Sequence, residues 1–429
     1  MTINNSLSGA SSSLSGASDI RPKLSALIQD LCPHGVEFKK LGEVATLSRG
    51  KVYSKEYLRD NAGEYPVYSS QTANNGELGR ISTYDYDGKY LTWTTDGAYA
   101  GTVFRREGRF SITNVCGLIS NVDKALSIDF LYYWLNKVAK GYVYQGMGNP
   151  KLMSNVMETI EIPLPPLEIQ EKIVECLDKF SALAAELQAE LQAELQKRRT
   201  QYEYYRTRLL TPPHADSTAN STDDCNWEWK TLGEICEVQD YVANGSFGDI
   251  KKNVQYYNEP NYALLVRITD LTNNFQNAQK VYIDEHAYNY MTKSRLDGDE
   301  IIISNVGSCG ATFLCPKLNV PMSLAPNAIL VRTPNNHFYY HWFCSKFGQE
   351  AINKIVAKSA MPKFNKTEFR KILLPFPPLA EQQRIADILD KFQSLTTSME
   401  EGIPAEQAAQ QKRYEYYRDL LLTFPRKEV

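Results

Sequence analysis

Two histidines stand four residues apart in the segment HFYYH, at His337 and His341. On a helix this spacing places both rings on one face, where they could ligate a metal ion. The chain holds only five histidines, its eight cysteines form no Cys-x-x-Cys pair, and no third ligand accompanies HFYYH. A packed aromatic helix is therefore the favoured interpretation, with no metal site, and the cysteines are interpreted as reduced, structural thiols.

Motifs for catalysis are equally sparse. No GxxxxGK[ST] segment occurs, so ATP hydrolysis by this chain is not expected. Residues 258–262 read NEPNY, which is similar to the Asn-Pro-Pro-Tyr of amino methyltransferases, but the second position differs and no Gly-rich cofactor loop precedes it. Five scattered histidines supply no Ser/His/Asp or Cys/His set. The chain is predicted to bind a partner and to lack a catalytic centre.

The charge balance restricts the kind of partner. A net charge of −3 argues against nonspecific coating of polyanions, although it leaves room for a local basic face. For either of two basic groups, an ordinary solvated surface explains the charges equally well. The groups are Arg105, Arg106 and Arg109, and Lys358, Lys363, Lys366, Arg370 and Lys371.

The N-terminus is rich in Ser and Gly, with the stretch SLSGASSSLSGASD. It lacks the basic start and apolar core of a signal peptide, so residues 1–19 are expected to be a disordered tail. No run of about 18 apolar residues is present, and no membrane span is expected. Together with reduced cysteines, this predicts a cytoplasmic protein.

The polar candidates lie within a chain that repeats itself. Residues 163–180 read PLPPLEIQEKIVECLDKF, and residues 375–392, 212 positions later, read PFPPLAEQQRIADILDKF. The same offset relates the two YEYYR segments that begin at Tyr202 and Tyr414. Because nothing is inserted between these landmarks, the two helical stretches have equal length. Two equal helical stretches predict a molecule with pseudo-twofold symmetry, which binds a partner that itself has two halves.

A divergent block precedes each helical stretch. The blocks begin at matching LGE segments, Leu41–Glu43 and Leu232–Glu234, and end with matching Pro-Lys-Leu and Pro-Lys-Phe segments at 150–152 and 362–364. Between these points the blocks differ in length and sequence. Short β-type runs such as YLTWT and IIIS, broken by Gly, Asn and Asp, predict a curved sheet in each block. One helix is expected near residues 129–140 and another near 338–357, with their Tyr and Trp side chains in the core.

The long helices are the clearest structural prediction. Apolar residues recur at steps of three and four from Ile173 to Leu195, which predicts a helix from after Pro166 to about Leu210. Its partner should break at the segment GIP and restart with Pro404 as a first-turn residue. Two equal apolar stripes predict an intramolecular antiparallel pair. The first helix also holds AELQ three times, at Ala185–Gln188, Ala189–Gln192 and Ala193–Gln196. Steps of four overshoot the helical repeat and locally unwind a supercoil.

These landmarks together resemble the specificity (S, HsdS) subunit of type I restriction-modification systems. The carriers are the two Pro-rich helix starts, the two YEYYR segments, the LGE segments and GIP. The block segments YPVYSSQTANNGELG, TWTTDGAYAGTVF, NVCG, NGSFGDIKKNV and IIISNVGSCGATF are also similar to the family. The resemblance covers the chain after residue 20, and the order, duplication and spacing of the motifs make it specific.

The resemblance implies an α+β protein with two target-recognition domains, each reading one half of a split, asymmetric sequence in double-stranded DNA. Two long helices packed as an antiparallel coiled coil hold the domains apart and dock two methyltransferase (M) subunits, through which endonuclease-translocase (R) subunits join. S-adenosylmethionine, ATP and Mg²⁺ are then expected on the partners, and no cofactor on this chain. The implied divisions are a tail at 1–19, recognition domains at 20–162 and 232–374, helical spacers at 163–211 and 375–429, and a linker at 212–231.

Base contacts are expected from amide, hydroxyl and basic side chains on loops, and phosphate contacts from Lys151 and Lys363. Many of these residues could equally be ordinary turn residues, and the bidentate amides of Gln71 and Asn244 rank first. In the first block the candidates are Ser69, Ser70, Gln71, Thr72, Asn74, Asn75, Thr94 and Thr95. In the second block they are Tyr241, Asn244, Ser246, Lys251, Lys252, Asn305 and Ser308.

The M subunits are expected on exposed faces of the helices, at Tyr202, Tyr205 and Arg206 and at Tyr414, Tyr417 and Arg418. Two other function classes stay open from the residues alone. A single-chain methyltransferase or nuclease would need a cofactor loop or a metal-binding carboxylate set that the sequence does not offer. A coiled-coil adaptor, with or without DNA binding and outside a restriction system, would gain nothing from two divergent blocks.

Overall fold

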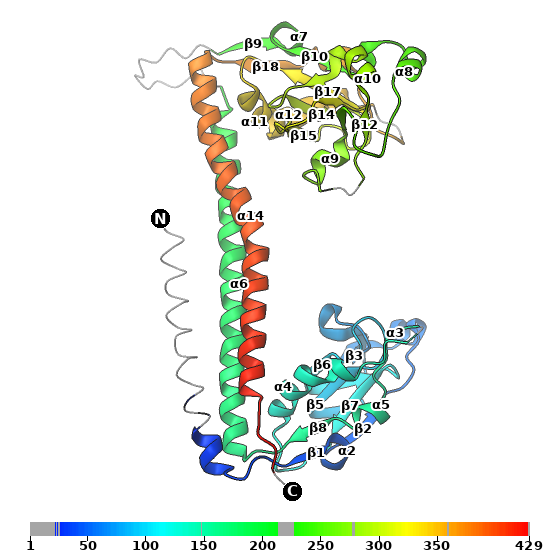
Figure 1. The fold of residues 1–429 in the computed structure, drawn as a ribbon, viewed down its shortest axis with the longest axis vertical. Coiled ribbons are helices and arrows are strands. Elements are labelled where there is room, and N and C mark those ends of the chain that lie inside the picture. Colours follow the sequence, from blue (N-terminus) through cyan, green and yellow to red (C-terminus); the bar gives the residue numbers. More distant parts are fainter. Residues whose placement is uncertain are drawn as a thin grey trace. The chain divides into compact units, whose positions relative to one another are not determined.

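The computed structural model describes residues 22, 24, 26–146, 148–212, 227–276, 279–357 and 360–427 (Figure 1). The predicted tail at 1–19, Lys358 and most of the predicted linker, residues 213–226, lie outside these ranges. The chain divides into two compact units, one of residues 1–190 with 404–429 and one of residues 191–403. No helix within the described ranges is long and apolar enough to cross a membrane.

The first unit contains one mixed sheet of six strands in the order β2-β7-β5-β6-β3-β4. Every pairing is antiparallel except that of β3 with β6, and β3 contains two register shifts that bend its edge. Tyr, Val, Thr and Trp side chains favour these pleated, half-buried positions. The strands are β2 (Thr46–Arg49), β3 (Ala62–Tyr68), β4 (Glu77–Ile81), β5 (Tyr86–Thr94), β6 (Val103–Ile112) and β7 (Cys116–Ser120).

One helix of this domain, α4 (Ile128–Val138), covers the sheet. Ser127 caps it by accepting a hydrogen bond from the Phe130 amide, and Phe130 and Leu131 pack against Leu91 and Trp93 of the sheet. The helix expected near residues 129–140 is confirmed, with its aromatic residues in the core. The remaining short helices are α2 (Leu41–Val44), α3 (Lys55–Asp60), η1 (Ala73–Gly76), η2 (Ala139–Tyr142) and α5 (Ser154–Met157).

The second unit holds a domain with two four-stranded sheets instead of the single curved sheet expected. One sheet is β10 (Glu237–Asp240), β17 (Ala328–Arg332), β14 (Ile301–Ser304) and β15 (Thr312–Leu314). The other is β12 (Tyr282–Ile283), β11 (Ala263–Val266), β16 (Met322–Leu324) and β13 (Arg295–Leu296). Their buried strands are continuous apolar runs, so periodicity alone could not divide them between sheets.

Helices α11 (Asn336–Cys344) and α12 (Lys346–Ile355) occupy the region where one helix was expected. Ser345 separates them and caps α12 by accepting from the Gly348 amide. Smaller helices of this domain are α7 (Leu232–Ile235), η3 (Tyr241–Asn244), α8 (Phe247–Asn253), α9 (Ile268–Thr272), α10 (Glu285–Tyr290), η4 (Thr292–Ser294) and α13 (Lys366–Phe369).

The repeated LGE segments lie in the same local structure in both units. Leu41 donates its amide to the Ile160 carbonyl at 2.8 Å, and Leu232 donates to Ile372, 212 positions after Ile160, at 2.8 Å. A two-stranded sheet flanks each contact. These sheets are β1 (Phe38–Lys40) with β8 (Glu161–Pro163), and β9 (Glu228–Thr231) with β18 (Leu373–Phe376).

The long helices are α6 (Leu167–Leu209) and α14 (Leu379–Leu421), each of 43 residues. The equal length and the bounds of α6 confirm the sequence prediction. Both helices begin in the same way, because the buried Gln170 and Gln382 donate to the Pro165 and Pro377 carbonyls at 2.7 and 2.8 Å. Within each unit the two helices run antiparallel and side by side (Figure 1). The predicted α+β class, with two α/β domains and two long helices, is confirmed.

The predicted break at GIP is wrong, since α14 continues through Pro404. A proline inside a helix costs about 3 kcal/mol, because it removes one amide donor and crowds the carbonyl four residues earlier. The buried Ile403 and the Arg199–Glu400 ion pair at 2.7 Å hold the preceding turn against α6. Gly402 and Pro404 are exposed, so the distortion is accommodated on the solvent side.

Candidate nucleic-acid interface

The two domains place a lysine beside the end of a strand by means of the same hydrogen bonds. In the first, the Leu152 amide donates to Thr95 and the Gly97 amide donates to Pro150, at 2.9 and 3.0 Å. These bonds hold Lys151 next to the turn that follows β5. Lys151 is exposed, and its Nζ lies 3.9 Å from a carboxylate oxygen of Asp96.

The second domain repeats this arrangement, with the Pro-Lys segment 212 residues later and the turn 210 residues later. The Phe364 amide donates to Asn305, and the Gly307 amide donates to Pro362, at 3.1 and 2.9 Å. Lys363, which is exposed, therefore occupies the position of Lys151. The turn beside it begins with Asn305 instead of Thr95 and is followed by different side chains. Both domains thus offer one equivalent cation next to residues that are not equivalent.

The predicted hydroxyl readers Thr94 and Thr95 require a correction. They are 1% and 0% exposed. Thr94 Oγ1 donates to the Tyr99 carbonyl, and Thr95 Oγ1 donates to the Val115 carbonyl at 2.8 Å. The two threonines therefore hold the turn together and do not reach solvent. Their hydroxyls are bonded to carbonyls five and twenty residues away, which no local sequence pattern reveals.

The loop from Ser69 to Gly76 lies beside this turn. Ser70 Oγ accepts a hydrogen bond from the Asp96 amide at 3.1 Å, which joins the two segments. Asn74 and Asn75 are exposed, and both adopt left-handed φ angles of 49° and 52°. Asn tolerates this region better than most residues, so the amides can be presented at the tip. Ser69, Gln71 and Thr72 are half-buried, and the Gln71 amide donates to the Glu77 carbonyl.

In the second domain, Tyr241 also requires a correction. Its side chain is buried, and its hydroxyl is bonded to that of Tyr256 at 2.6 Å. Asn244, ranked first as an amide reader, donates to Ser294 Oγ at 2.9 Å and accepts from the Lys293 amide at 2.9 Å. Its amide therefore joins η3 to η4, which sequence spacing could not reveal.

Other candidates of the second domain remain accessible. Ser246 is exposed and caps α8, whose last turn presents the exposed Lys251 and Lys252. Ser308 is exposed and lines a hollow of about 550 Å³, which Arg267 and Asn327 also line. Asn305 is half-buried, and its side-chain oxygen has no hydrogen-bond partner within the described ranges. Their roles in binding DNA stay predictions.

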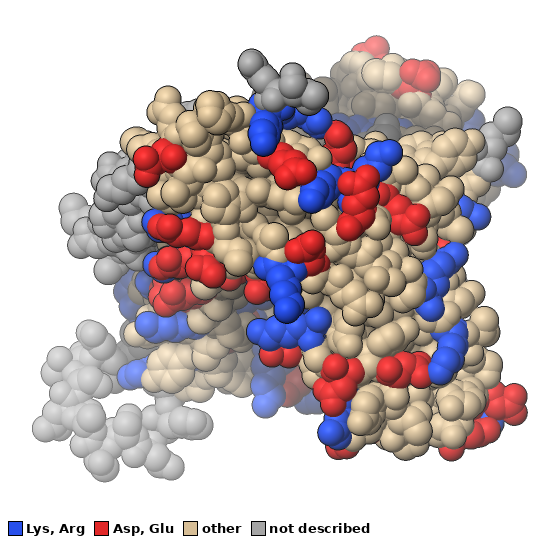
Figure 2. Space-filling view, turned by 90° about the horizontal axis from the view of Figure 1, so that it is seen from below, with Lys and Arg blue, Asp and Glu red and all other residues tan. Residues whose placement is uncertain are grey.

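The face drawn in Figure 2 shows Lys and Arg side chains mixed with Asp and Glu side chains. Within the basic group of the second domain, Lys366 pairs with Asp240 at 3.0 Å and Lys371 pairs with Glu368 at 2.8 Å. Lys363 and Arg370 are exposed. This mixed charge distribution favours phosphate binding by a few individual lysines over a general electrostatic attraction of DNA to the surface.

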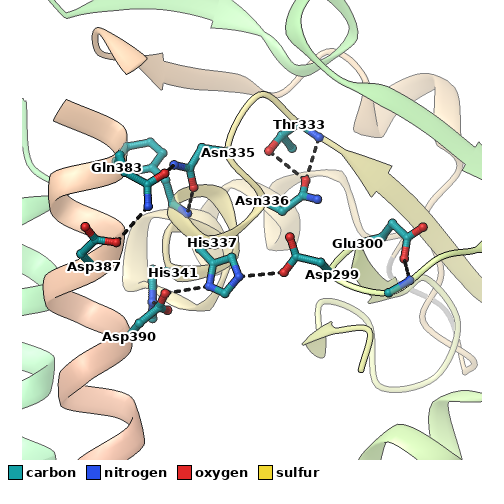
Figure 3. Close-up of polar contacts among 12 residues, drawn as sticks. Asp299, Glu300, Thr333, Asn335, Asn336, His337, His341, Gln383, Asp387 and Asp390 are labelled. Atoms are coloured by element: carbon teal, nitrogen blue, oxygen red, sulfur yellow. Dashed lines mark hydrogen bonds and ion pairs between the residues drawn. The ribbon is translucent and has the colours of Figure 1, made fainter. Parts of the chain in front are cut away.

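The repeated LDKF segments attach each domain to its long helices. Asp178 accepts hydrogen bonds from Arg105 Nη1 at 2.9 Å and from the Tyr133 hydroxyl. The equivalent Asp390 lies 2.8 Å from His341 Nε2 and 2.7 Å from His337 Nδ1 (Figure 3). The same aspartate therefore anchors α4 in one unit and α11 in the other, although its partners differ completely.

The two histidines that contact Asp390 lie in different surroundings. His341 is 0% exposed, burial lowers its pKa, and its Nδ1 lies 2.9 Å from the Tyr202 hydroxyl. Its neutral form can donate to Asp390 and accept from Tyr202. His337 lies between Asp390 and Asp299, with its two ring nitrogens 2.7 Å from their oxygens (Figure 3). Within the described ranges, no three His, Cys, Asp or Glu side chains are grouped to hold a metal ion.

The exposed helix faces are not where the sequence placed them. The Tyr205 ring stacks on Phe392, the Tyr417 ring stacks on Phe180, and Tyr202 bonds His341. Tyr414 is half-buried, Arg206 pairs with Glu203 at 2.6 Å, and Arg418 pairs with Asp419 at 2.8 Å. The middle tyrosines of the two segments, Tyr204 and Tyr416, are 56% and 61% exposed. In a YEYYR helix only one tyrosine of each segment faces solvent, because the others turn toward the paired helix or the domain.

Comparison with known proteins gives a consistent result. The family described as type I restriction modification DNA specificity domain matches residues 33–197 and 225–407. A type I specificity subunit of Mycoplasma pneumoniae is 31% identical over 383 residues, which cover 89% of this chain and 96% of that protein. The MpnII specificity subunit of the same organism is 43% identical over 168 residues, which cover 39% of this chain and 51% of that protein.

Solved structures share the fold. The HsdS subunit of Thermoanaerobacter tengcongensis aligns over 91% of this chain and 97% of its own, with a TM-score of 0.54 and 15% identity. A chain from a structure of type I R-M complex assembly and conformational transition aligns over 90% of this chain and 97% of its own, with a TM-score of 0.64 and 14% identity. At these identities the likeness concerns the fold alone.

Proposed function

The chain belongs to the family of type I restriction-modification DNA specificity subunits, which are non-catalytic, and we propose that it reads a bipartite, asymmetric DNA site. Each α/β domain reads one half-site. The observation that carries this proposal is the equivalent placement of Lys151 and Lys363 beside non-equivalent turns. Phosphates are the same in both half-sites, so the same cation can bind them in each domain. The base sequences of the half-sites differ, so the residues that read them must differ.

In the first domain the reading surface consists of Asn74 and Asn75 at the loop tip, with Ser70 and Lys151 beside them. In the second domain it consists of Ser246, Lys251 and Lys252 at helix α8 and of Ser308 in the turn that begins with Asn305. Side-chain amides and hydroxyls read base edges in the major groove, and the lysines bind phosphates. Each half-site therefore receives its own set of donors and acceptors.

Two methyltransferase subunits dock on the long helices in this proposal, and restriction subunits join through them. The exposed Tyr204 and Tyr416 are the best-supported contacts, since they are large, amphipathic and repeated at the same offset as the rest of the helices. One site in each repeat accounts for two copies of one partner. S-adenosylmethionine, ATP and Mg²⁺ then belong to these partners.

Helix α6 sets the spacing between the half-sites. Its 43 residues span about 65 Å at 1.5 Å per residue. That length equals about two turns of B-DNA, at some 34–36 Å per turn. The three AELQ segments lie within this helix and adjust its length in steps of one tetrapeptide.

The test compares the purified chain alone with the chain co-purified with its cognate methyltransferase subunit. Alone, it should bind DNA weakly and transfer no methyl group, because its net charge is −3 and its sequence offers no cofactor loop. The complex should bind one bipartite sequence and methylate adenine within it. Adenine methylation by the chain alone, or tight stoichiometric binding of S-adenosylmethionine by it, would contradict the proposal.

A further inference from the structure

Strand β6 carries three arginines, and two of them are paired with acids. Arg105 lies 2.9 Å from both Asp129 and Asp178. Arg109 lies 3.0 Å from Asp87 and is half exposed. Each of these two guanidinium groups is paired with an acidic side chain, which accounts for an arginine at that position of the strand. The third arginine of this group, Arg106, is different.

Arg106 is only 3% exposed, and it forms no ion pair within the part of the chain that the structure describes. Its Nε donates to Thr92 Oγ1 at 3.0 Å. Both terminal nitrogens, Nη1 and Nη2, are buried, and neither has a hydrogen-bond partner among the described residues. The guanidinium carbon lies 3.5 Å from the centroid of the Tyr68 ring, so one face of the group is covered by an aromatic surface.

An unpaired cation in such a place is costly for the folded chain. Burial lowers the pKa of the Arg106 guanidinium, which shows that its surroundings disfavour charge. The neighbouring Cys116 thiol is neutral at pH 7, because burial raises its pKa to about 12. Replacing a buried unpaired ion with an apolar side chain is often neutral or stabilising, so packing alone does not account for Arg106.

The loop from Ser69 to Gly76, which carries the exposed asparagines, covers the free end of Arg106. Gly76 has a φ of +79°, and a Cβ at this position would lie 3.0 Å from Arg106 Nη2 and 3.1 Å from the Gln71 carbonyl oxygen. A side chain at position 76 would therefore make close steric contact with both the Arg106 guanidinium and the loop backbone. The loop is closed by the Ser69 amide, which donates to the Gly76 carbonyl at 2.9 Å.

We propose that Arg106 is a DNA-reading residue of the first domain, covered by the Ser69–Gly76 loop until the half-site is bound. This inference rests on the proposed function. When the asparagine tip engages DNA, the loop moves aside, and Nη1 and Nη2 donate to two acceptors on one base edge. Guanine is the base that offers this pair in the major groove, through O6 and N7.

A guanine explains the burial better than a phosphate does. Phosphate contacts require only a cation, and the exposed Lys151 already supplies one. A buried fork instead penalises every base that lacks the acceptor pair, since the cation then stays unpaired in a dry site. The buried, unpaired Arg106 lowers the stability of the free protein, and the same feature makes the bound protein discriminate between bases.

The test uses the complex with the cognate methyltransferase subunit and three variants. Arg106→Met removes the charge, Arg106→Lys keeps the charge but loses the fork, and Arg109→Met is the control on the same strand. Sequencing of N6-methyladenine in the host gives the recognised site of each. We expect both Arg106 variants to relax the preference at one guanine by about tenfold. The second half-site should be unchanged, and Arg109→Met should match the wild type.

A chemical substitution separates guanine from phosphate. Oligonucleotides with 7-deazaguanine, which lacks the N7 acceptor, should bind the wild-type complex about tenfold more weakly at one position of the first half-site. The Arg106→Met complex should not distinguish the two bases. The melting temperature of Arg106→Met should be unchanged or higher than that of the wild type. A uniform loss of binding with unaltered specificity, an unchanged methylome, or a melting temperature lowered by several degrees would each overturn the assignment. A bipartite methylated site would still support the proposed function in all three cases.

Discussion

The rings of Phe180 and Tyr417 stack 5.4 Å apart at an angle of 8°. Tyr205 and Phe392 form the same pair in the second unit, 5.0 Å apart at 20°. Phe392 is the counterpart of Phe180 at the 212-residue offset, and Tyr417 is the counterpart of Tyr205. Each repeat therefore supplies the phenylalanine of one stack and the tyrosine of the other, which explains why LDKF and YEYYR recur with unchanged spacing.

These stacks predict which tyrosines stabilise the fold. Tyr205→Ala and Tyr417→Ala should each lower the free energy of unfolding by about 2 kcal/mol, because a half-buried ring loses its partner. Tyr204→Ala and Tyr416→Ala should each cost less than about 0.5 kcal/mol, since these rings are exposed. Denaturant titration of the four variants measures the difference. Equal losses at all four positions would show that the stacks contribute nothing.

The same pair of exposed tyrosines provides the test of partner docking. The double variant Tyr204→Ala/Tyr416→Ala should weaken association with the methyltransferase subunit by at least about tenfold, as expected for two aromatic contacts at an interface. Its melting temperature should stay close to that of the wild type. Titration of labelled methyltransferase subunit gives the affinity. Unaltered affinity would move the docking surface away from these residues.

The anchor at Asp390 should make the second unit sensitive to acid. Burial by itself would raise the pKa of this carboxyl, but the hydrogen bond from His341 and the electrostatic interaction with His337 together lower it. A carboxylate with a lowered pKa stabilises the fold above its unfolded value of about 4, and this contribution is lost as the pH falls through the folded value. Asp390→Asn should therefore lower the melting temperature at pH 7 and have little effect near pH 3.

A neighbouring aspartate on α14 is the control for this measurement. Asp387 is exposed and accepts only from Gln383 Nε2, at 2.9 Å, among the hydrogen bonds described. Asp387→Asn should leave the melting temperature unchanged at both pH values. An equal destabilisation by Asp390→Asn at pH 7 and pH 3 would mean that the side chain acts through packing and not through its charge.

The tetrapeptide repeat should set the spacer between the half-sites. Deleting Ala189–Gln192 removes four helical residues, or about 6 Å, and rotates the helix by about 40° beyond a full turn. One base pair rotates DNA by about 35°, so both changes match a loss of about one spacer base pair. The methylome of the deletion strain should keep both half-sequences with a shorter spacer. An unchanged spacer would show that the repeat only fills the helix pair.

The helical part of the fold was predictable because its signals are local. Apolar spacing from Ile173 onward and the duplicated proline-rich segments were enough to define α6 nearly to the residue. The error at Pro404 arose because the proline penalty is also local, whereas the packing that offsets it comes from residues about two hundred positions away, such as Arg199.

The site was less predictable, because exposure depends on distant segments. Thr94 ends strand β5 and Thr95 follows it, and both look like turn residues, yet both are buried and their hydroxyls are bonded to the Tyr99 and Val115 carbonyls. Asn244 has the chemistry of a base reader, yet Ser294 and Lys293 occupy its amide. The equivalence of Lys151 and Lys363 was readable from the repeated Pro-Lys segments, since a conserved offset implies a conserved local structure.

An exchange of one block tests most directly whether the domains read independently. Residues 41–162 of this chain are replaced by the equivalent block of a relative with a different recognised site, while both long helices are kept. Methylated adenines are then mapped by sequencing the host DNA. One half of the methylated site should change to the relative's half, with the other half and the spacer retained. A change in both halves would contradict the account of two separate readers on one helical frame.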